Sequence, residues 1–103
     1  MILFDVILRA NSEQREGLVQ LLRKTMAASR AEPGCLIYRF TGDLDDPLRF
    51  HLIELWATEA DLMAHAAGPA FRSFLAELPG LGALLGSTAR QGSLEPYSFV
   101  RPQ

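Results

Sequence analysis

The sequence predicts a single α+β domain with the ferredoxin-like order β-α-β-β-α(α)-β, built on a four-stranded antiparallel sheet. Short apolar runs alternate with segments whose apolar residues recur at helical spacing, and Pro and Gly stand between them. The chain has 103 residues, 49% of them hydrophobic, and it shows no repeat or linker. We therefore expect residues 1–103 to form one domain with its own core.

The first strand is predicted over residues 2–9, whose β-branched and aromatic side chains suit a central position in the sheet. Asp5 interrupts this run and no basic segment precedes it, so we expect a strand and not a secretory signal. No apolar run approaches the roughly 18 residues of a membrane span. The expected location is the cytoplasm.

A helix should follow, because leucine and methionine side chains recur at helical spacing and define one apolar face. These are Leu18, Leu21, Leu22 and Met26. Asn11 or Ser12 is expected to cap its start, with Glu13 and Glu16 favouring the positive end of the helix dipole. The helix should end before Pro33-Gly34, since Pro disfavours helical geometry in the residue before it.

Two further strands are predicted over residues 35–41 and 49–57, joined by the turn-rich segment 42–47. Side chains alternate between the two faces of a strand. One face of the third strand should therefore carry Phe50, Leu52, Glu54 and Trp56, and the other Arg49, His51, Ile53 and Leu55.

Thr58, with Asp61 three positions later, predicts the start of a helix over residues 59–67. Gly68-Pro69 should break it, and a second short helix is expected over residues 70–78.

The Gly-rich segment 79–86 suits a loop or one loose helical turn, and the last strand is expected over residues 87–93. The apolar stretch 97–100 is expected either to extend that strand or to form a tail that lies on another subunit.

The charge distribution argues against nucleic acid and membranes as partners. The net charge is −2, the pI is near 5.6, and the ten basic residues never cluster. Cys35 is the single cysteine, which excludes an internal disulfide, and a buried, inert thiol is the simpler interpretation of it.

Glu54 and His65 are the candidates for chemistry. Glu54 lies among apolar side chains, so it must be paired or partly hydrated, or its pKa must rise. It can be a structural hydrogen-bonding group or a functional one. His65, on the helix after the third strand, can be a general acid or base near neutral pH or a packing residue near a helix C-terminus.

The sequence resembles the antibiotic biosynthesis monooxygenase-like family over residues 2–78. The stretches that carry the resemblance are Glu54-x-Trp56, Ala64-His65, Gly68-Pro69-x-Phe71-x-x-Phe74, Glu32-Pro33-Gly34-Cys35 and Asp43-x-Asp45-Asp46-Pro47. The resemblance implies a dimeric α+β barrel with a small pocket between sheet and helices in each subunit. It also implies a monooxygenase that oxidises quinol-like or polycyclic aromatic molecules with O2 and without metal, flavin or haem.

Such a reaction needs a base, an aromatic wall and a partner for the substrate anion. His65 or Glu54 is expected to be the base, and Arg72 or Arg39 the anion partner. The wall would be formed by Trp56, Tyr38 and Phe71. Tyr38 can equally be a core aromatic, and Arg72 a solvated or ion-paired residue.

Other branches of the family resemble this chain less. The haem-degrading branch uses an Asn, a Trp and a His at positions that match Asp5, His65 and Leu75, so its haem-ligating His is absent. His51 and His65 lack the spacing of a metal site. A sugar-phosphate isomerase would need a cationic phosphate site, for which only Arg39, Arg49, Arg72 and Arg90 are available.

A non-catalytic small-ligand-binding or stress-response dimer remains a further alternative, in which the same residues only pack. A homodimer is expected in any case, because one face of a four-stranded sheet would otherwise stay uncovered. We expect the contact to use that face and the tail.

Overall fold

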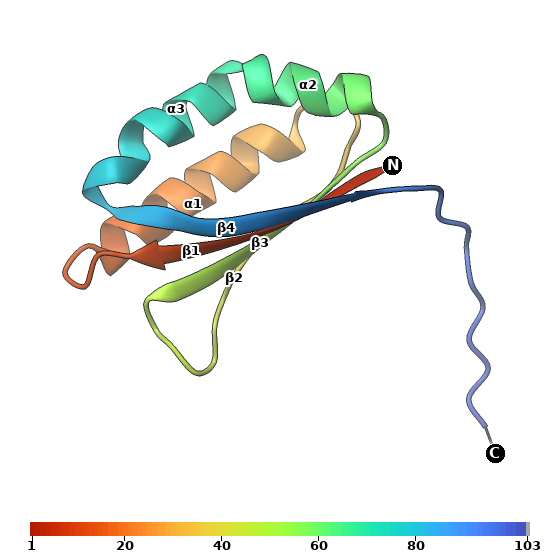
Figure 1. Cartoon of the computed structure of the whole chain (residues 1–103), viewed down its shortest axis with the longest axis horizontal. Helices are drawn as coiled ribbons and strands as arrows, with labels where there is room; N and C mark the ends of the chain where they lie inside the picture. Colours follow the sequence, from red (N-terminus) through yellow and green to blue (C-terminus); the bar gives the residue numbers. More distant parts are fainter. Residues whose placement is uncertain (103) are drawn as a thin grey trace.

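The computed structural model describes residues 1–102. Its elements are β1 (Ile2–Ala10), α1 (Arg15–Arg30), β2 (Cys35–Gly42), β3 (Arg49–Trp56), α2 (Glu59–Ala67), α3 (Pro69–Glu77), the short 3₁₀ helix η1 (Leu78–Gly80) and β4 (Gly82–Gln91). The four strands form one antiparallel sheet in the order β2-β3-β1-β4. The predicted ferredoxin-like fold class is therefore confirmed (Figure 1).

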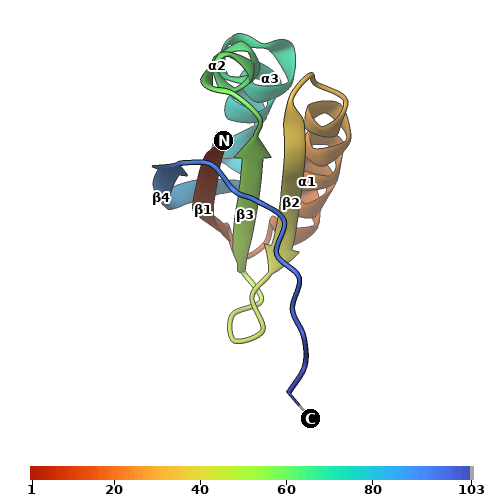
Figure 2. The same ribbon diagram turned by 90° about the vertical axis from the view of Figure 1, so that its right-hand side faces the viewer.

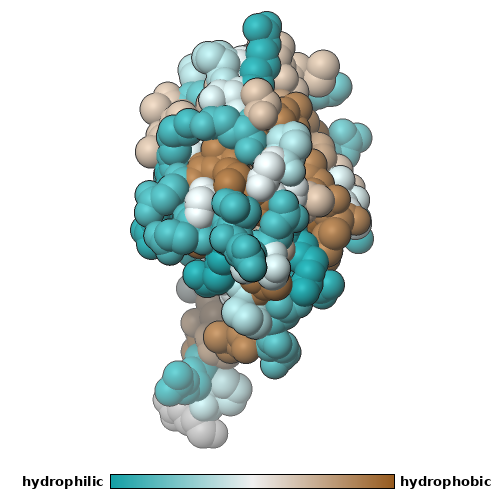
Figure 3. Space-filling view, turned by 90° about the vertical axis from the view of Figure 1, so that its left-hand side faces the viewer, coloured by the Kyte–Doolittle hydropathy of each residue, from teal (hydrophilic) through white to brown (hydrophobic). Residues whose placement is uncertain are grey.

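The helices cover one face of the sheet and leave the other uncovered (Figures 1 and 2). Side chains of β3 alternate as predicted, with Phe50, Leu52, Glu54 and Trp56 buried on the helix side. β1 is an inner strand, as expected, but only its helix-side residues are buried, whereas Leu3 and Asp5 are exposed on the opposite face. From the side shown in Figure 3, hydrophilic side chains cover most of the surface and apolar ones show between them.

The core fills the space between this face and the helices. Its centre consists of Leu8, Leu18 and Trp56, none of which is exposed. Leu18 comes from the apolar face of α1 that the helical spacing predicted. Trp56 is thus fixed at the end of β3 next to the start of α2.

The start of α1 differs from the prediction. Neither Asn11 nor Ser12 caps it; the helix begins at Arg15, and Gln14 precedes it without a side-chain capping bond. The Asn11 amide group instead donates a hydrogen bond to the Gly80 carbonyl oxygen, and its backbone N–H to that of Leu81. Asn11 therefore joins the end of β1 to the loop before β4. The cap of α2 is as predicted, since the Thr58 hydroxyl accepts the Asp61 N–H at 3.1 Å.

β4 begins five residues before the predicted start, because the Gly-rich segment 82–86 pairs with β1. A Cβ atom at Gly82 would overlap the Arg9 carbonyl oxygen, so glycine is needed for this close approach. The register shifts between Ile7 and Leu8, which marks a β-bulge.

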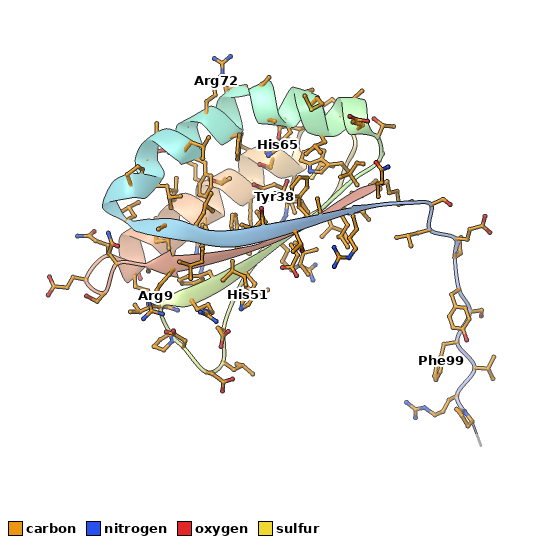
Figure 4. The ribbon with its side chains drawn as sticks, viewed as in Figure 1. Arg9, Tyr38, His51, His65, Arg72 and Phe99 are labelled. Carbon is orange, nitrogen blue, oxygen red and sulfur yellow. The ribbon has the colours of Figure 1, made fainter. Side chains whose placement is uncertain are left out.

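Residues 92–102 form no strand: Gly92 exchanges two backbone hydrogen bonds with Met1, and the chain beyond it leads away from the body as an exposed tail (Figures 1 and 4). The interpretation that residues 97–100 extend the last strand is therefore wrong. Tyr97 and Phe99 are 84% and 71% exposed. In the described part of the chain, no helix has the length and hydrophobicity to cross a membrane.

Candidate functional site

A cavity of about 150 Å³ lies between the helix side of the sheet and α3. Its lining residues are Phe4, Val6, Tyr38, Leu52, Glu54, Phe71, Phe74, Leu84 and Ser87. All four strands and α3 contribute to it. The lining is apolar and aromatic except for Tyr38, Glu54 and Ser87, which is the composition expected of a small-molecule site.

Among residues 1–102, Glu54 is the one carboxylate that lines this cavity. It faces the helices because of the alternation along β3, and only 7% of the residue is exposed. Its Oε1 atom accepts a hydrogen bond of 2.9 Å from the Trp56 indole N–H. Burial raises the pKa of Glu54, and the charge of Glu32 acts in the same direction. The Trp56 bond and His65 oppose that rise in pKa without cancelling it.

His65 is in the last turn of α2 and its side chain points toward the sheet (Figure 4), with only 3% of the residue exposed. Its Nδ1 atom lies 2.6 Å from Glu32 Oε1. Its Nε2 atom lies 3.8 Å from Glu54 Oε1 and has no hydrogen-bond partner among the described residues. His65 thus stands between two carboxylates, one bonded to it and the other within reach of a small movement.

Aromatic rings hold the imidazole in place. The ring centroids of Trp56, Phe71 and Tyr38 lie 4.6, 5.4 and 5.5 Å from that of His65. Contacts of this kind fix the plane of the ring and exclude water from it. Burial, followed by the charge of Glu54, raises the pKa of Tyr38 above its ordinary value, so its hydroxyl remains neutral and able to donate.

The structure brings Glu54, His65, Tyr38 and Phe71 together, as the proposed roles require. It places Trp56 elsewhere than expected: the indole does not line the cavity but lies behind Glu54 and bonds to it. Trp56 therefore supports the carboxylate and is not part of the wall.

The two expected anion partners lie outside the site. Arg72 is exposed and projects from α3 away from the sheet (Figure 4). Arg39 lies on the uncovered face, because its neighbours Tyr38 and Phe40 are buried on the helix side. His51 lies on the uncovered face too, 3.0 Å from Asp43. The lining of the cavity, within residues 1–102, includes no arginine.

Glu32 is the residue of this site that the sequence did not reveal. It lies in the turn between α1 and β2, and it contacts His65 across 33 positions of sequence. Pro33 and Gly34 identify this segment as a turn, but nothing in the sequence indicates that the turn reaches the end of α2.

The chain is similar in sequence and in fold to several known proteins. Residues 1–77 match the family described as antibiotic biosynthesis monooxygenase. A crystal structure from Deinococcus radiodurans, provisionally named as such a monooxygenase, is 28% identical over 96% of this chain and 99% of its own, with a TM-score of 0.85. A Pseudomonas aeruginosa protein is 29% identical over 92% of this chain and 94% of its own, with a TM-score of 0.77.

A curated relative, an uncharacterized protein of Synechocystis, is 30% identical over 96 residues, which make up 93% of this chain. The chain spans 61% of the length of that relative.

Proposed function

The chain belongs to the antibiotic biosynthesis monooxygenase family, and we propose that it oxidises a small hydroxylated aromatic ring with O2, with Glu54 as the base. One observation carries the proposal. A buried carboxylate whose pKa is raised lines a cavity whose other walls are apolar and aromatic. A carboxylate with a raised pKa is a stronger base once ionised, and an apolar, aromatic cavity binds a flat ring.

The reaction balances without another reductant. Glu54 takes the proton of the ring hydroxyl, and the resulting anion passes an electron to O2. Recombination forms a carbon–oxygen bond, and a phenol with a free ring position becomes a quinone. One oxygen atom of O2 enters the quinone, the other leaves as water, and the substrate supplies all the electrons.

Tyr38 is the proposed partner of the anion, in place of an arginine. It lines the same cavity as Glu54, and its hydroxyl, neutral at neutral pH already with an ordinary pKa, becomes still harder to ionise because burial raises that pKa. A neutral hydroxyl in a largely apolar site can donate a hydrogen bond to the ring oxygen as negative charge develops there.

The size of the cavity favours one ring over a polycyclic substrate. Its volume is about 150 Å³. An apolar cavity of roughly this volume holds one benzene molecule. We therefore expect a single-ring quinol or phenol to be preferred over the fused-ring substrates that the family resemblance also allows.

The test compares methylhydroquinone, menadiol and anthrone, which have one, two and three rings, by O2 uptake and by transfer of ¹⁸O from ¹⁸O2 to the product. We expect the highest kcat/KM for the single ring. Glu54→Gln should lower kcat about 100-fold or more, since it removes the base. Glu77→Gln is the matched control, because Glu77 is an exposed carboxylate bonded to Lys24 and Ser73, outside the cavity.

Equal turnover by wild type and Glu54→Gln would refute the role of Glu54. Binding of the ring without O2 uptake would instead favour the non-catalytic ligand-binding alternative. No arginine of residues 1–102 lines the cavity, so nothing in the site supports a sugar-phosphate isomerase.

Homodimerisation through the uncovered sheet face is part of the same proposal. That face exposes Leu3, Ile37 and Ile53 to between 38% and 46%. Asp5 and Arg39 flank Ile53 on the two neighbouring strands, so one row across the sheet carries a negative charge, an apolar side chain and a positive charge. A two-fold axis along β3 would bring Asp5 of each protomer opposite Arg39 of the other.

A further inference from the structure

Three side chains connect the cavity with the outer surface. Glu54 lines the cavity, and Glu32 lines a separate groove between α1 and α3. His65 lies between the two carboxylates. The side chain of Glu32 is 21% exposed and that of His65 only 3%, so water reaches the outer carboxylate but not the imidazole.

The contacts of the imidazole define where its proton lies. A carboxylate only accepts hydrogen bonds, so the 2.6 Å contact requires His65 Nδ1 to donate to Glu32. In the neutral ring the other nitrogen, Nε2, then carries a lone pair. Nε2 is buried without a hydrogen-bond partner in the described residues, and the nearest carboxylate oxygen is Glu54 Oε1 at 3.8 Å.

We propose that Glu32 is a positioning residue that keeps the proton of neutral His65 on Nδ1, so that Nε2 can take and return the proton that Glu54 removes from the ring hydroxyl. The inference deepens the proposed function and rests on it for the source of the proton. As the proton moves, the Glu54 O–H bond breaks and the His65 Nε2–H bond forms. The imidazolium is then held between two carboxylates, and no electron moves in this step.

The surrounding chain favours this arrangement. His65 is in the last turn of α2, where the helix dipole stabilises a cation. A Cβ atom at Gly68 would lie 3.3 Å from Glu32 Oε2, so the glycine at the end of α2 leaves room for the carboxylate. A buried carboxylate that fixes a histidine through Nδ1–H has the same role in the Ser-His-Asp triad.

The chain has two histidines, and the second one is an internal control. His51 Nε2 lies 3.0 Å from Asp43 Oδ2 on the uncovered face, on the opposite side of the sheet from the cavity. With ¹⁵N-labelled histidine, the ring nitrogen shifts of each imidazole report which nitrogen carries the proton.

The first experiment measures these shifts at a pH where both rings are neutral. We expect wild-type His65 to carry its proton on Nδ1. Glu32→Leu, which removes the acceptor, should move it toward Nε2. Glu32→Gln, which keeps an acceptor oxygen, should retain the Nδ1–H form and serves if the leucine variant does not fold. Asp43→Leu should change His51 alone. A wild-type His65 protonated on Nε2, or an unchanged tautomer in Glu32→Leu, would overturn the proposal.

The second experiment uses turnover of the single-ring substrate. Glu32→Gln removes the charge that stabilises the imidazolium, so kcat should fall about tenfold or more, whereas KM should stay within about twofold because Glu32 does not line the cavity. Glu77→Gln should match wild type. An unchanged kcat in Glu32→Gln would overturn the proton-holding role. If wild type turns over no ring, the proposed function fails, and the nitrogen shifts still decide whether Glu32 sets the tautomer.

Discussion

At the scale of single residues, the site depends on one carboxylate placed where water is scarce. Glu54 is 7% exposed and receives one hydrogen bond, from Trp56. A single bond compensates only part of the cost of burying a charge. Glu54 therefore lowers the stability of the folded protein at neutral pH, which fits its proposed role as a base.

This cost predicts a specific dependence of stability on pH. Below about pH 4.5, the ordinary value for Glu54, the carboxyl group is protonated in both the folded and the unfolded state. As the pH rises from there through the raised pKa of the folded state, the stability that the neutral group contributes is lost. Above that pKa the loss is complete and constant.

Glu54→Gln removes this titration. The free energy of unfolding of wild type should therefore decrease relative to that of the variant between pH 4.5 and neutral pH. Urea unfolding at a series of pH values measures it, with Glu13→Gln as an exposed control that should follow wild type. If the stability of wild type instead decreased relative to that of Glu54→Gln toward acid pH, the pKa of Glu54 would not be raised.

The sequence predicted correctly the orientation of residues whose position follows from local periodicity. The alternation of β3 placed Glu54 on the helix side, because the pleat of a strand leaves no other choice. The prediction that Arg72 faces the cavity was wrong. Arg72 directly follows Phe71, and successive helix residues point about 100° apart, so the two side chains cannot both face the cavity. Glu32 could not be predicted, since its contact with His65 depends on how the α1–β2 turn packs against the end of α2.

At the scale of elements, the turn between α1 and β2 controls the site. Glu32 is in this turn, and Gly34 closes it with a φ of 76°. A Cβ atom at Gly34 would overlap the carboxyl group of Asp61, and the Gly34 carbonyl oxygen accepts the Ala57 N–H at 2.8 Å. The turn is thus bound to the connection between β3 and α2.

Gly34→Ala should therefore destabilise the protein by about 1–2 kcal/mol or more, from the left-handed backbone conformation and the overlap with Asp61 together. Thermal or urea unfolding measures the effect. Gly42→Ala is the matched control, because nothing lies within 4 Å of a Cβ atom there. Equal stability of the two variants would show that this turn is not constrained as described.

The bounds of an element were predicted best where the local sequence favours the structure that the element adopts. α2 was predicted with the observed bounds, since Thr58 caps it and Gly68 ends it. The start of β4 was predicted too late, because its glycines are typical of a loop. Pairing with β1 along the whole of Gly82–Gln91 outweighs that local preference.

At the scale of the whole molecule, the uncovered face and the tail are the surfaces through which we propose that two copies of the protein associate. Leu3, Ile37 and Ile53 leave apolar surface on the side without helices. The tail adds the exposed side chains of Tyr97 and Phe99. A face that mixes apolar rows with one oppositely charged pair suits a second copy of the same chain.

The charged row provides the test of the dimer. Arg39→Asp should raise the dimer dissociation constant about tenfold or more, because like charges would then face each other across the two-fold axis. Asp5→Arg should raise the dissociation constant in the same way. The double variant Asp5→Arg, Arg39→Asp should restore association, because opposite charges face each other again. Sedimentation equilibrium across nanomolar to micromolar concentrations measures it. If the double variant associated more weakly than either single variant, or if wild type were a monomer, the proposed packing of two sheets would be excluded.

The contact between Trp56 and His65 makes the site observable without any label. Trp56 is the single tryptophan of the chain, is 0% exposed and lies with its ring centroid 4.6 Å from that of His65. The tryptophan emission of the protein therefore originates from one indole, behind Glu54 at the back of the cavity. Because a protonated imidazole quenches indole emission, the intensity of this emission should report the charge of His65.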